Sequence, residues 1–524
     1  MTKRPVFLHQ TPWLLLGLTA SALISGCAVG PDYVRPEVPM STEFKPTPGW
    51  KIAAPEDDVT KGAWWNIYRD PVLNELMDQV EPNNQNIALY VARVRQAQAL
   101  ASGANAARYP TFGLNADGGR DASGTGNKSQ LVNPDGSIND GSIYNTVNLY
   151  GGVSWDADLW GKLRRNVESK DASFVASVAD LENAKLSIQT QLAQAYFLLR
   201  SLDSQKVLLE STAKSNLRGV TLSKNQYEVG VKARADFINA DAQYKSVQAQ
   251  QIDVGVNRAA QESLIAVLIG KPASDFSMAF NPLPTRGTLV VPVVPPGLPS
   301  ELLERRPDVA AAERRMASAN AQIGYQMAAY YPSLTLNSSQ NNIGYLGSSF
   351  SQLLTTPFLY WGLGPSLALT VLDFGARAAN VEQARGVYDE NVATYRQTVL
   401  TAIQEVETQL AALRIYQQES VIQDQAAELG ELGVNIALNR YEAGIDNYTN
   451  VVVAQNNALN YQQKSITIAQ QRLNASVLLI KALGGSWSTQ AAKAAATNDK
   501  TLSTTQTQQQ QATQNEQANQ RPGG

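Results

Sequence analysis

Histidine and cysteine are nearly missing from this sequence, which holds one histidine, His9, and one cysteine, Cys27. Both lie in the first 27 of 524 residues, so a chain cleaved just before Cys27 contains no imidazole. This absence excludes histidine general bases, histidine-ligated metals and the Ser-His-Asp or Cys-His type of nucleophile. The sequence also has no phosphate-binding loop and no metal-ligand spacing. We therefore expect no enzyme activity, no metal site and no cofactor.

A basic surface is lacking as well. The first 26 residues contain two basic residues and no acids, so the remainder carries 41 basic and 46 acidic residues, a net charge of −5. Such a chain has no positive field to recruit nucleic acid, and we expect no nucleic-acid partner. Apolar residues make up 44% and charged residues 17%. That balance excludes a disordered chain and a polytopic helical membrane protein.

The N-terminus has the layout of a bacterial lipoprotein signal. Two basic residues precede an apolar core, formed by residues 13–18 and 22–24, that is too short to span a bilayer as a stable helix. Ile24-Ser25-Gly26-Cys27 then resembles a lipobox, in which the cysteine becomes the lipidated first residue. We expect residues 1–26 to be removed and Cys27 to be acylated, with the outer membrane as destination. The alternative is an ordinary secretory signal with a chance cysteine.

Proline is absent from residues 161–229, and Gly219 is the one glycine inside this stretch. Apolar residues recur there at spacings of three and four, with Lys185 and Lys206 in two skipped positions. The apolar positions are Val178, Leu181, Ile188, Leu192, Ala195, Leu199, Leu202 and Leu209. This heptad seam predicts long, gently supercoiled helices packed side by side. One continuous helix would be about 100 Å long.

A second, returning helix is expected after this long one. Gly230 is placed to cap the first helix, and a short turn at 231–235 leads to a helix over 236–269. Asp236 is expected to be its N-cap. Shorter helices are expected at 71–80 and 84–109, after a proline-rich extended leader at 28–60.

In other stretches apolar and polar residues alternate strictly, which predicts β-strands. The apolar positions are Phe112, Leu114, Ala116, Val147, Leu149, Gly151, Val153, Trp155, Ala157, Leu334, Leu336, Leu363, Leu367, Leu369 and Val371. One apolar and one polar face is typical of a transmembrane β-barrel strand, although a soluble hairpin gives the same alternation. Aromatic girdles mark both membrane interfaces, so aromatic residues near the strand ends favour the barrel. These residues are Tyr144, Tyr150, Trp155 and Trp160.

The chain repeats itself. Tyr227-Glu228-Val229-Gly230 matches Tyr441-Glu442-Ala443-Gly444 at an offset of 214, and the register holds without a gap from 161/375 to 270/484. The second half is therefore expected to supply helices at 306–331, 375–443 and 447–484 and two further strands. An internal repeat of this size indicates one architecture used twice. We divide the chain into the signal 1–26, an extended segment and first helix 27–83, a first repeat 84–270, a linker 271–305, a second repeat 306–485 and a disordered tail 486–524.

Four strands are too few to close a barrel, because the smallest filled barrels need about eight. Open sheet edges are not tolerated in lipid. The chain is therefore expected to share its barrel with other copies. The sequence does not fix their number: three copies would give twelve strands and two would give a tight eight.

These features resemble the outer-membrane efflux factors, the TolC and OprM group. The resemblance covers residues 28–488 and is carried by the duplicated element order and by several motifs. The motifs are Glu304-Arg305-Arg306-Pro307-Asp308-Val309, Tyr331-Pro332-Ser333-Leu334, Asp373-Phe374-Gly375, Tyr441-Glu442-Ala443-Gly444 with Asp446-Asn447-Tyr448, and Ala454-Gln455.

The resemblance implies an α+β membrane protein that forms a homotrimer. Each protomer would give four transmembrane β-strands to a shared 12-stranded β-barrel, which a long periplasmic α-helical barrel continues. The implied function is a passive outer-membrane exit duct for drugs or other small toxic molecules. Its implied partners are a periplasmic adaptor protein, an inner-membrane RND-type pump and outer-membrane lipid.

The resemblance also implies a periplasmic gate where the two hairpin turns meet, with Tyr441 bonding toward Asp236. The expected gate residues are Tyr227, Asp236, Tyr441, Asp446, Asn450 and Val453, and the expected turn and adaptor-contact residues are Gly230, Lys232, Arg234 and Gly444. The family often has acids at the constriction where this chain has Asn450 and Val453, so an anionic ring is not expected. We further expect Asp446 to pair across the ring with Lys232 or Arg234. The alternative is that the tyrosines pack helix ends and Asp236 only caps.

Three other functions fit parts of the pattern. A duct for metal ions or for type I protein secretion would have the same architecture, although the methionines are scattered rather than clustered. A non-channel periplasmic coiled-coil protein would explain the heptads but not the strands between them. The sequence identifies neither the cargo nor the pump.

Overall fold

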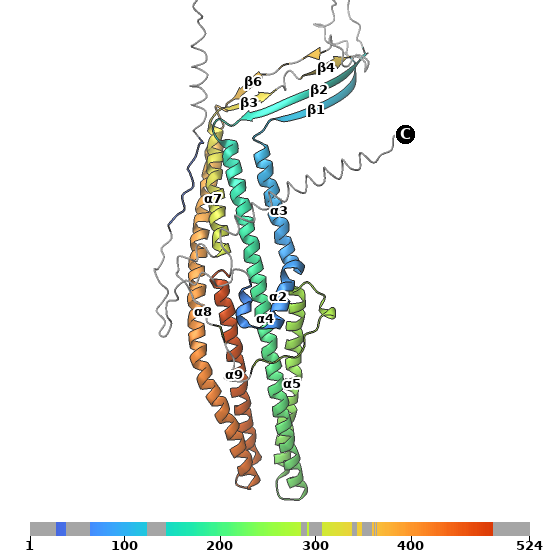
Figure 1. The fold of residues 1–524 in the computed structure, drawn as a ribbon, viewed down its shortest axis with the longest axis vertical. Coiled ribbons are helices and arrows are strands. Elements are labelled where there is room, and N and C mark those ends of the chain that lie inside the picture. Colours follow the sequence, from blue (N-terminus) through green and yellow to red (C-terminus); the bar gives the residue numbers. More distant parts are fainter. Residues whose placement is uncertain are drawn as a thin grey trace, which may run out of the picture. The chain divides into compact units, whose positions relative to one another are not determined.

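The computed structural model describes residues 28–37, 63–122, 143–284, 291–292, 306–337, 343–347, 359–360, 362 and 364–485. The expected signal peptide, Cys27, Glu304, Arg305, Leu363 and the tail 486–524 lie outside these residues. In chain order the elements are η1 (Trp64–Tyr68), α2 (Pro71–Asn83), α3 (Gln85–Ala106), β1 (Thr111–Ala122), β2 (Ile143–Ala157), α4 (Lys162–Glu228), α5 (Arg234–Leu268), η2 (Ala273–Asp275), α7 (Pro307–Met327), η4 (Ala328–Tyr330), β3 (Ser333–Asn337), β4 (Ile343–Gly347), β5 (Leu359–Tyr360), β6 (Gly364–Ala368), α8 (Ala376–Glu442) and α9 (Tyr448–Ala482) (Figure 1).

The chain forms two compact units, and each draws on both halves of the sequence. The strand unit comprises Met1–Pro36, Arg95–Phe174 and Arg314–Ala393. The hairpin unit comprises Glu37–Val94, Val175–Glu313 and Thr394–Gly524. We expected a first repeat, a linker and a second repeat in chain order. This division differs from the two compact units, and it stays a prediction. No described helix contains an 18-residue stretch of the hydropathy that a membrane-spanning helix needs.

Among the described residues, the strand unit holds one antiparallel sheet with six strands. β1 pairs with β2 over Thr111–Ala122, while β3 and β4 pair with successive stretches of the opposite edge of β2. β6 then pairs with β3, and β5 pairs with β4. The six strands therefore occupy four positions across the sheet, which is the number expected from the alternating stretches.

The register of the sheet brings the apolar positions into phase. Phe112 lies opposite Val153, and Leu334 lies between Ala157 of β2 and Leu367 of β6. Residues directly opposite in a sheet point to the same face. The predicted apolar residues inside the described strands therefore share one face of the sheet. Leu369 and Val371 were expected to continue this pattern, but β6 ends at Ala368 and they lie outside the strand.

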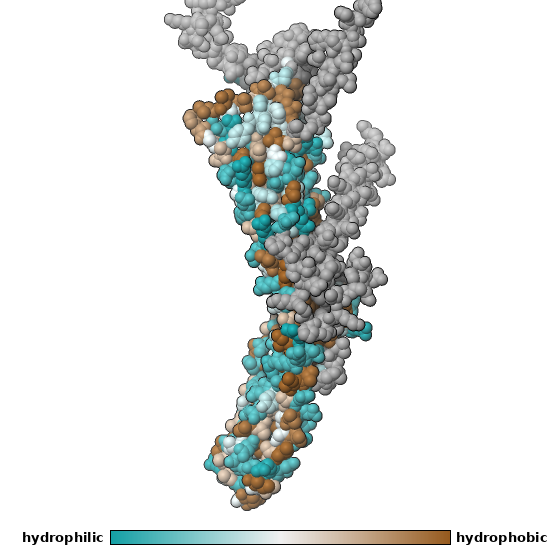
Figure 2. Space-filling model, turned by 90° about the vertical axis from the view of Figure 1, so that its left-hand side faces the viewer, coloured by the Kyte–Doolittle hydropathy of each residue, from teal (hydrophilic) through white to brown (hydrophobic). Residues whose placement is uncertain are grey.

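Several side chains of this apolar face are exposed in the part of the chain that the structure describes. Phe112 is 74% exposed, Leu114 70% and Leu367 68%. Figure 2 shows hydrophobic residues, in brown, on the surface formed by the strands. Exposed apolar residues gathered in this way mark a surface that contacts lipid or another protein.

Aromatic residues gather where the strands end and the helices begin. The Trp160 indole donates a 2.7 Å hydrogen bond to the Pro332 carbonyl, and its ring stacks on Tyr331 at 4.8 Å. Trp155 donates to the Arg108 carbonyl at 2.9 Å. Both tryptophans are among the aromatic residues that the sequence predicts near strand ends.

The N-terminal leader is held in the strand unit by a buried arginine. The Arg165 guanidinium donates to the carbonyl oxygens of Val29 at 3.3 Å and Gly30 at 3.2 Å. It also forms a 2.8 Å ion pair with Asp32. The Val29 amide in turn donates to the Trp160 carbonyl at 2.9 Å. The backbone two residues after Cys27 is thereby fixed to the start of α4.

Two helical hairpins of equal size make up most of the hairpin unit. α4 and α8 each contain 67 residues, and α5 and α9 each contain 35. Their first residues, Lys162 and Ala376, and again Arg234 and Tyr448, are 214 positions apart. The helices therefore begin and end at the positions that the sequence offset pairs.

The heptad seam predicted for the long helix is buried in this unit. Leu192, Leu199 and Leu209 are fully buried, and Ile188, Ala195 and Leu202 are nearly so. They pack with residues of α2 and α5 such as Leu73 and Ile265. At one skipped position, the Lys185 ammonium pairs with the Glu81 carboxylate at 2.6 Å.

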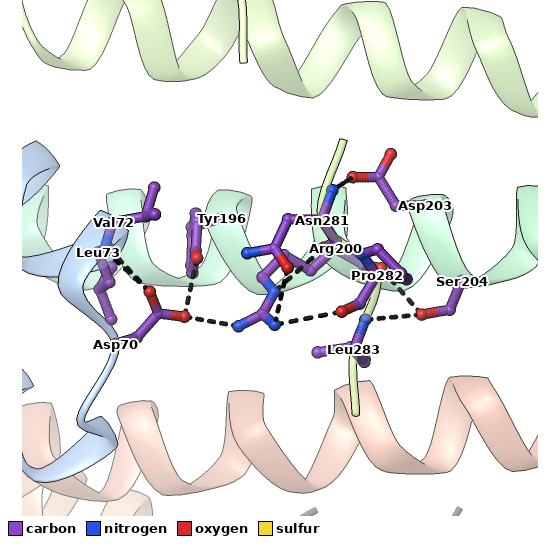
Figure 3. A network of polar contacts seen from close by, with 10 residues as sticks. All are labelled: Asp70, Val72, Leu73, Tyr196, Arg200, Asp203, Ser204, Asn281, Pro282 and Leu283. Atoms are coloured by element: carbon purple, nitrogen blue, oxygen red, sulfur yellow. Dashed lines mark hydrogen bonds and ion pairs between the residues drawn. The ribbon is translucent and has the colours of Figure 1, made fainter. Parts of the chain in front are cut away.

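A network of polar contacts ties the segment after α5 to α4 (Figure 3). One Asp70 carboxylate oxygen caps α2, and the other accepts hydrogen bonds from Tyr196 at 2.8 Å and Arg200 at 2.5 Å. Arg200 also donates to the carbonyls of Asn281 and Pro282, each at 3.2 Å. This part of the expected linker is thus firmly attached to the long helix.

One expectation about the return helix is wrong. α5 begins at Arg234, and its N-cap is Ala233, which makes no side-chain cap. Asp236 lies inside the first turn, where its negative charge still complements the helix dipole. The extended backbone of Ala233 starts the helix before Asp236 is reached.

Candidate functional site

The candidate site is the pair of turns that joins the helices of each hairpin. Gly230 and Gly444 adopt positive φ angles of 77° and 75°, which glycine reaches without strain. Their amides donate to the carbonyls of Tyr227 at 2.9 Å and Tyr441 at 3.0 Å. This left-handed cap satisfies orphan carbonyls of the long helix, as the sequence predicted for Gly230.

Two tyrosines of the second hairpin form the centre of the site. The rings of Tyr441 and Tyr448 meet edge to face, with centroids 5.1 Å apart. Both are fully buried in a cluster with Ala240 of α5 and Val451 of α9. Such pairs contribute roughly 0.5–1.5 kcal/mol beyond their buried area. The aromatic pair therefore joins the second hairpin to the first.

Tyr448 enters a recess in the first hairpin. A Cβ atom added at Gly219 of α4 would lie 2.2 Å from the Tyr448 hydroxyl oxygen. Only a glycine leaves room for the ring at this point. The Tyr448 hydroxyl is buried and has no hydrogen-bond partner of good geometry among the described residues. Burial raises the pKa of Tyr448, and the nearby Gln455 side chain lowers it by a smaller amount.

Tyr441 lies between two charged residues of the first hairpin. The Lys232 ammonium is 4.8 Å from the centre of its ring, a cation–π contact. Burial, with smaller contributions from the Asp236 carboxylate and Tyr448, raises the pKa of Tyr441 to about 12. The hydroxyl has no hydrogen-bond partner among the described residues. Asp236 therefore acts on Tyr441 through its charge, and the expected hydrogen bond between the two side chains is not formed in the described structure.

Asp446 is paired within its own turn. Its carboxylate accepts a 2.6 Å hydrogen bond from the Arg440 guanidinium, which lowers the pKa of Asp446. This contact closes the second turn onto the end of α8. The expected pair with Lys232 or Arg234 would join two copies of the chain and stays a prediction.

The remaining predicted gate residues lie at the surface of the turns. Asn450 and Val453 are exposed on α9. The backbone N–H of Asn450 donates a 3.3 Å hydrogen bond to the side-chain oxygen of Asn447. Tyr227 is 41% exposed. The described turns therefore bring Lys232, Asp236 and Tyr441 together. The other four predicted gate residues lie apart from them: Tyr227, Asp446, Asn450 and Val453.

Sequence reasoning missed Tyr448 and Gly219 as members of the site. Gly219 carried a signal, since it is the lone glycine in a long helix that lacks proline. A glycine there costs about 1 kcal/mol relative to alanine, so its presence calls for a packing reason. Tyr448 belongs to the motif Asp446-Asn447-Tyr448, but nothing in the sequence pairs it with Gly219, because its partner lies in the other hairpin.

Known proteins with similar sequences agree with the architecture described above. The family model described as outer membrane efflux protein matches residues 76–271 and 298–485. The solvent efflux pump outer membrane protein SrpC of Pseudomonas putida is 26% identical over 479 residues, covering 90% of this chain and 98% of that protein. The antibiotic efflux pump outer membrane protein ArpC of Pseudomonas putida is 28% identical over 490 residues, covering 92% and 97%.

A solved structure agrees with the fold. The outer-membrane channel OprN superposes with a TM-score of 0.78 at 25% identity, covering 88% of this chain and 99% of that one. The family model, the two relatives and this structure span both the strands and the hairpins. The chain belongs to the outer membrane efflux protein family.

Proposed function

We propose that this chain is the outer-membrane duct of a tripartite efflux pump. The observation that carries the proposal is the sheet, whose apolar side chains are in phase on one face and uncovered. A sheet with an apolar outer face and a polar inner face is the arrangement of a transmembrane barrel. The polar positions, such as Thr335 hydrogen-bonded to Asp156 at 2.7 Å, would then face water.

Several copies are needed to complete this barrel. Among the described strands, β1 and β6 each pair on one side only, so the sheet of one chain has two open edges. Open edges in hydrocarbon would leave backbone groups unsatisfied at several kcal/mol each. Four sheet positions in each of three copies give a twelve-stranded barrel. The equal hairpins, offset by 214 residues, support a repeat that continues the barrel as a helical tunnel.

A lipid on Cys27 would anchor the chain at the level of the strand ends. The support is the leader, which Arg165 and Trp160 hold from Val29 onward. Aromatic residues such as Trp160 and Tyr331 lie beside it, as expected at a membrane interface.

Cargo and partners follow from the named relatives. SrpC is named for solvents and ArpC for antibiotics, so we propose that small, largely apolar toxic molecules leave through this duct. The turns at Gly230 and Gly444 would be the end that meets a periplasmic adaptor and, through it, an inner-membrane pump. The proposed closed state is held by Tyr441 and Tyr448.

The test is deletion of the gene followed by measurement of accumulation of a fluorescent dye and susceptibility to solvents, antibiotics and metal ions. The proposal predicts increased accumulation of dyes and drugs, restored by the intact gene. Unchanged accumulation, or sensitivity to metal ions alone, would contradict it. Loss of a secreted protein without a change in drug susceptibility would instead support a secretion duct.

A further inference from the structure

A largely apolar cavity lies between the end of α7 and the start of α8. It has a volume of about 430 Å³. Met327, Tyr330 and Tyr331 line one side, and Ala378 and Val381 of α8 line the other. All of these residues belong to the strand unit. The volume is within the range of pockets that bury a small ligand, and this lining suits an apolar one.

The charged residues in the lining of the cavity lie at its rim. Glu382 and Arg385 pair with each other at 3.5 Å, and their side chains are 76% and 56% exposed. Val381, by contrast, is buried. Burying a charge is costly unless the charge is paired and hydrogen-bonded. An apolar chain can therefore lie against Val381 while both charged groups stay in water.

The N-terminal leader follows one face of α7 toward this cavity. The Asn320 side chain donates to the Pro31 carbonyl at 2.9 Å, and a Cβ added at Gly30 would lie 2.4 Å from the Gly324 Cα. Going back along the leader thus means going forward along α7. Met327 comes next on the same face, because residues at spacings of four and three are neighbours on a helix surface. The track of the leader therefore ends at the cavity wall.

The first described residues of the leader lie beside the same wall. A Cβ added at Gly161 would lie 2.8 Å from the Ala28 Cα. The Val29 amide donates to the Trp160 carbonyl at 2.9 Å, and the Trp160 ring stacks on Tyr331 with centroids 4.8 Å apart. Tyr331 in turn lines the cavity. Trp160 therefore connects the start of the described leader to the cavity wall.

We propose, on the basis of the acylation of Cys27 proposed above, that the cavity receives one acyl chain carried by Cys27. An extended backbone from Gly30 back to Cys27 covers about 10 Å, which equals about six or seven residues of helix. The same distance along α7 from Gly324 reaches the level of Tyr330 and Tyr331. Covalent attachment keeps the acyl chain at a high local concentration, so it competes well with bilayer lipid for the cavity. The lipid would then fasten the leader to α8 as well as to the membrane.

Photo-cross-linking of the full-length protein in cells tests the position of the acyl chain. Cells fed a fatty acid with a diazirine group would attach it to Cys27, and irradiation would join it to whatever it contacts. After purification and digestion, we expect the Cys27 peptide joined to a peptide that contains Met327 or Val381.

Three other results of this experiment would overturn the proposal. An acylated Cys27 peptide joined only to phospholipid would do so and leave the anchor standing. Cavity peptides joined to phospholipid would assign the cavity to a bilayer lipid. An unmodified Cys27 peptide would remove both the anchor and the proposed occupant. Dye accumulation tests the efflux function separately.

A matched pair of variants shows whether the cross-link depends on the cavity. Ala378→Trp fills the cavity, and Ala378 is exposed, so the chain should fold normally. This variant should lose most of the cross-link to the Met327 peptide while Cys27 stays acylated. Ala379→Trp is the control and should keep the cross-link, because Ala379 is also exposed but is not part of the lining. Equal cross-linking of the two variants would overturn the proposal.

A binding measurement gives a second readout that needs no cross-linking. Trp160 reports on the cavity because its ring stacks on Tyr331. A Cys27→Ser chain exported with an ordinary secretory signal carries no lipid, so its cavity should bind an added brominated fatty acid, which quenches nearby tryptophan fluorescence. The acylated protein should resist this quenching, and Trp160→Phe in the Cys27→Ser chain should remove most of it. Equal quenching of the acylated and unacylated proteins would overturn the proposal.

Discussion

The recess at Gly219 can be tested by adding a single methyl group. In Gly219→Ala the new Cβ would lie 2.2 Å from the Tyr448 hydroxyl, and Tyr448 is fully buried and cannot move away cheaply. Alanine in a helix interior gains about 1 kcal/mol over glycine. Overpacking of a filled site costs about 1–3 kcal/mol. The net effect expected at the hairpin turns is a destabilisation of about 0–2 kcal/mol.

A matched control separates the clash from the helix propensity. Gly255→Ala adds the same methyl group to α5, where it meets nothing within 4 Å, and should stabilise its helix by about 1 kcal/mol. The two variants should therefore differ by about 1–3 kcal/mol, which is the clash alone. Tyr448→Phe removes the clashing oxygen and a buried hydroxyl without a good hydrogen bond. Combined with Gly219→Ala, it should restore most of the lost stability.

Native-state hydrogen exchange of peptides from the turns gives the assay, because it reports the free energy of local opening. Gly219→Ala should speed exchange around residues 216–223 and 441–455, and the double variant should slow it again. The reasoning is refuted if Gly219→Ala and Gly255→Ala slow exchange equally. It is also refuted if Tyr448→Phe fails to rescue the first variant.

Four further outcomes follow from contacts of the turns and the leader. Burial raises the pKa of Tyr441 to about 12, so the closed turns should be fully stable below pH 10 and lose stability between about pH 10 and 12. The loss should be seen as rising single-channel conductance. Conductance that does not change over this pH range would argue against a buried tyrosine. Lys232→Met should remove about 0.5–1 kcal/mol of cation–π attraction and speed exchange at the turns relative to wild type. Asp446→Lys should raise single-channel conductance, and no change would remove its role in closure. Arg165→Gln should expose the leader to limited proteolysis after residue 28, whereas an unchanged digest would show that the arginine does not hold it.

The long helices and the strands could be predicted because each follows a single period. The seam through Leu192, Leu199 and Leu209 is buried as the heptads required, and the alternating residues Phe112 and Leu367 share one face. Both patterns are set by residues near in sequence, which is what periodicity reports. At most of the helix ends, the observed bounds differ from the expected ones by a few residues.

The contacts of the site could not be predicted in the same way, because they join residues far apart in the chain. Tyr448 and Gly219 meet only after two hairpins pack, and no local pattern pairs them. Asp446 pairs with Arg440, which lies only six residues away in the sequence. We considered only partners in another copy of the chain and did not predict this local pair. Asp236 was wrong as an N-cap because one extended residue, Ala233, starts the helix early.

The central claim is that several copies of the chain share one pore. Measuring the mass of the intact assembly tests this claim most directly. Native mass spectrometry of the protein extracted from outer membranes in mild detergent should give three copies, each acylated at its first residue. A monomer or dimer as the intact species would contradict the account, since neither supplies the twelve sheet positions that the barrel requires.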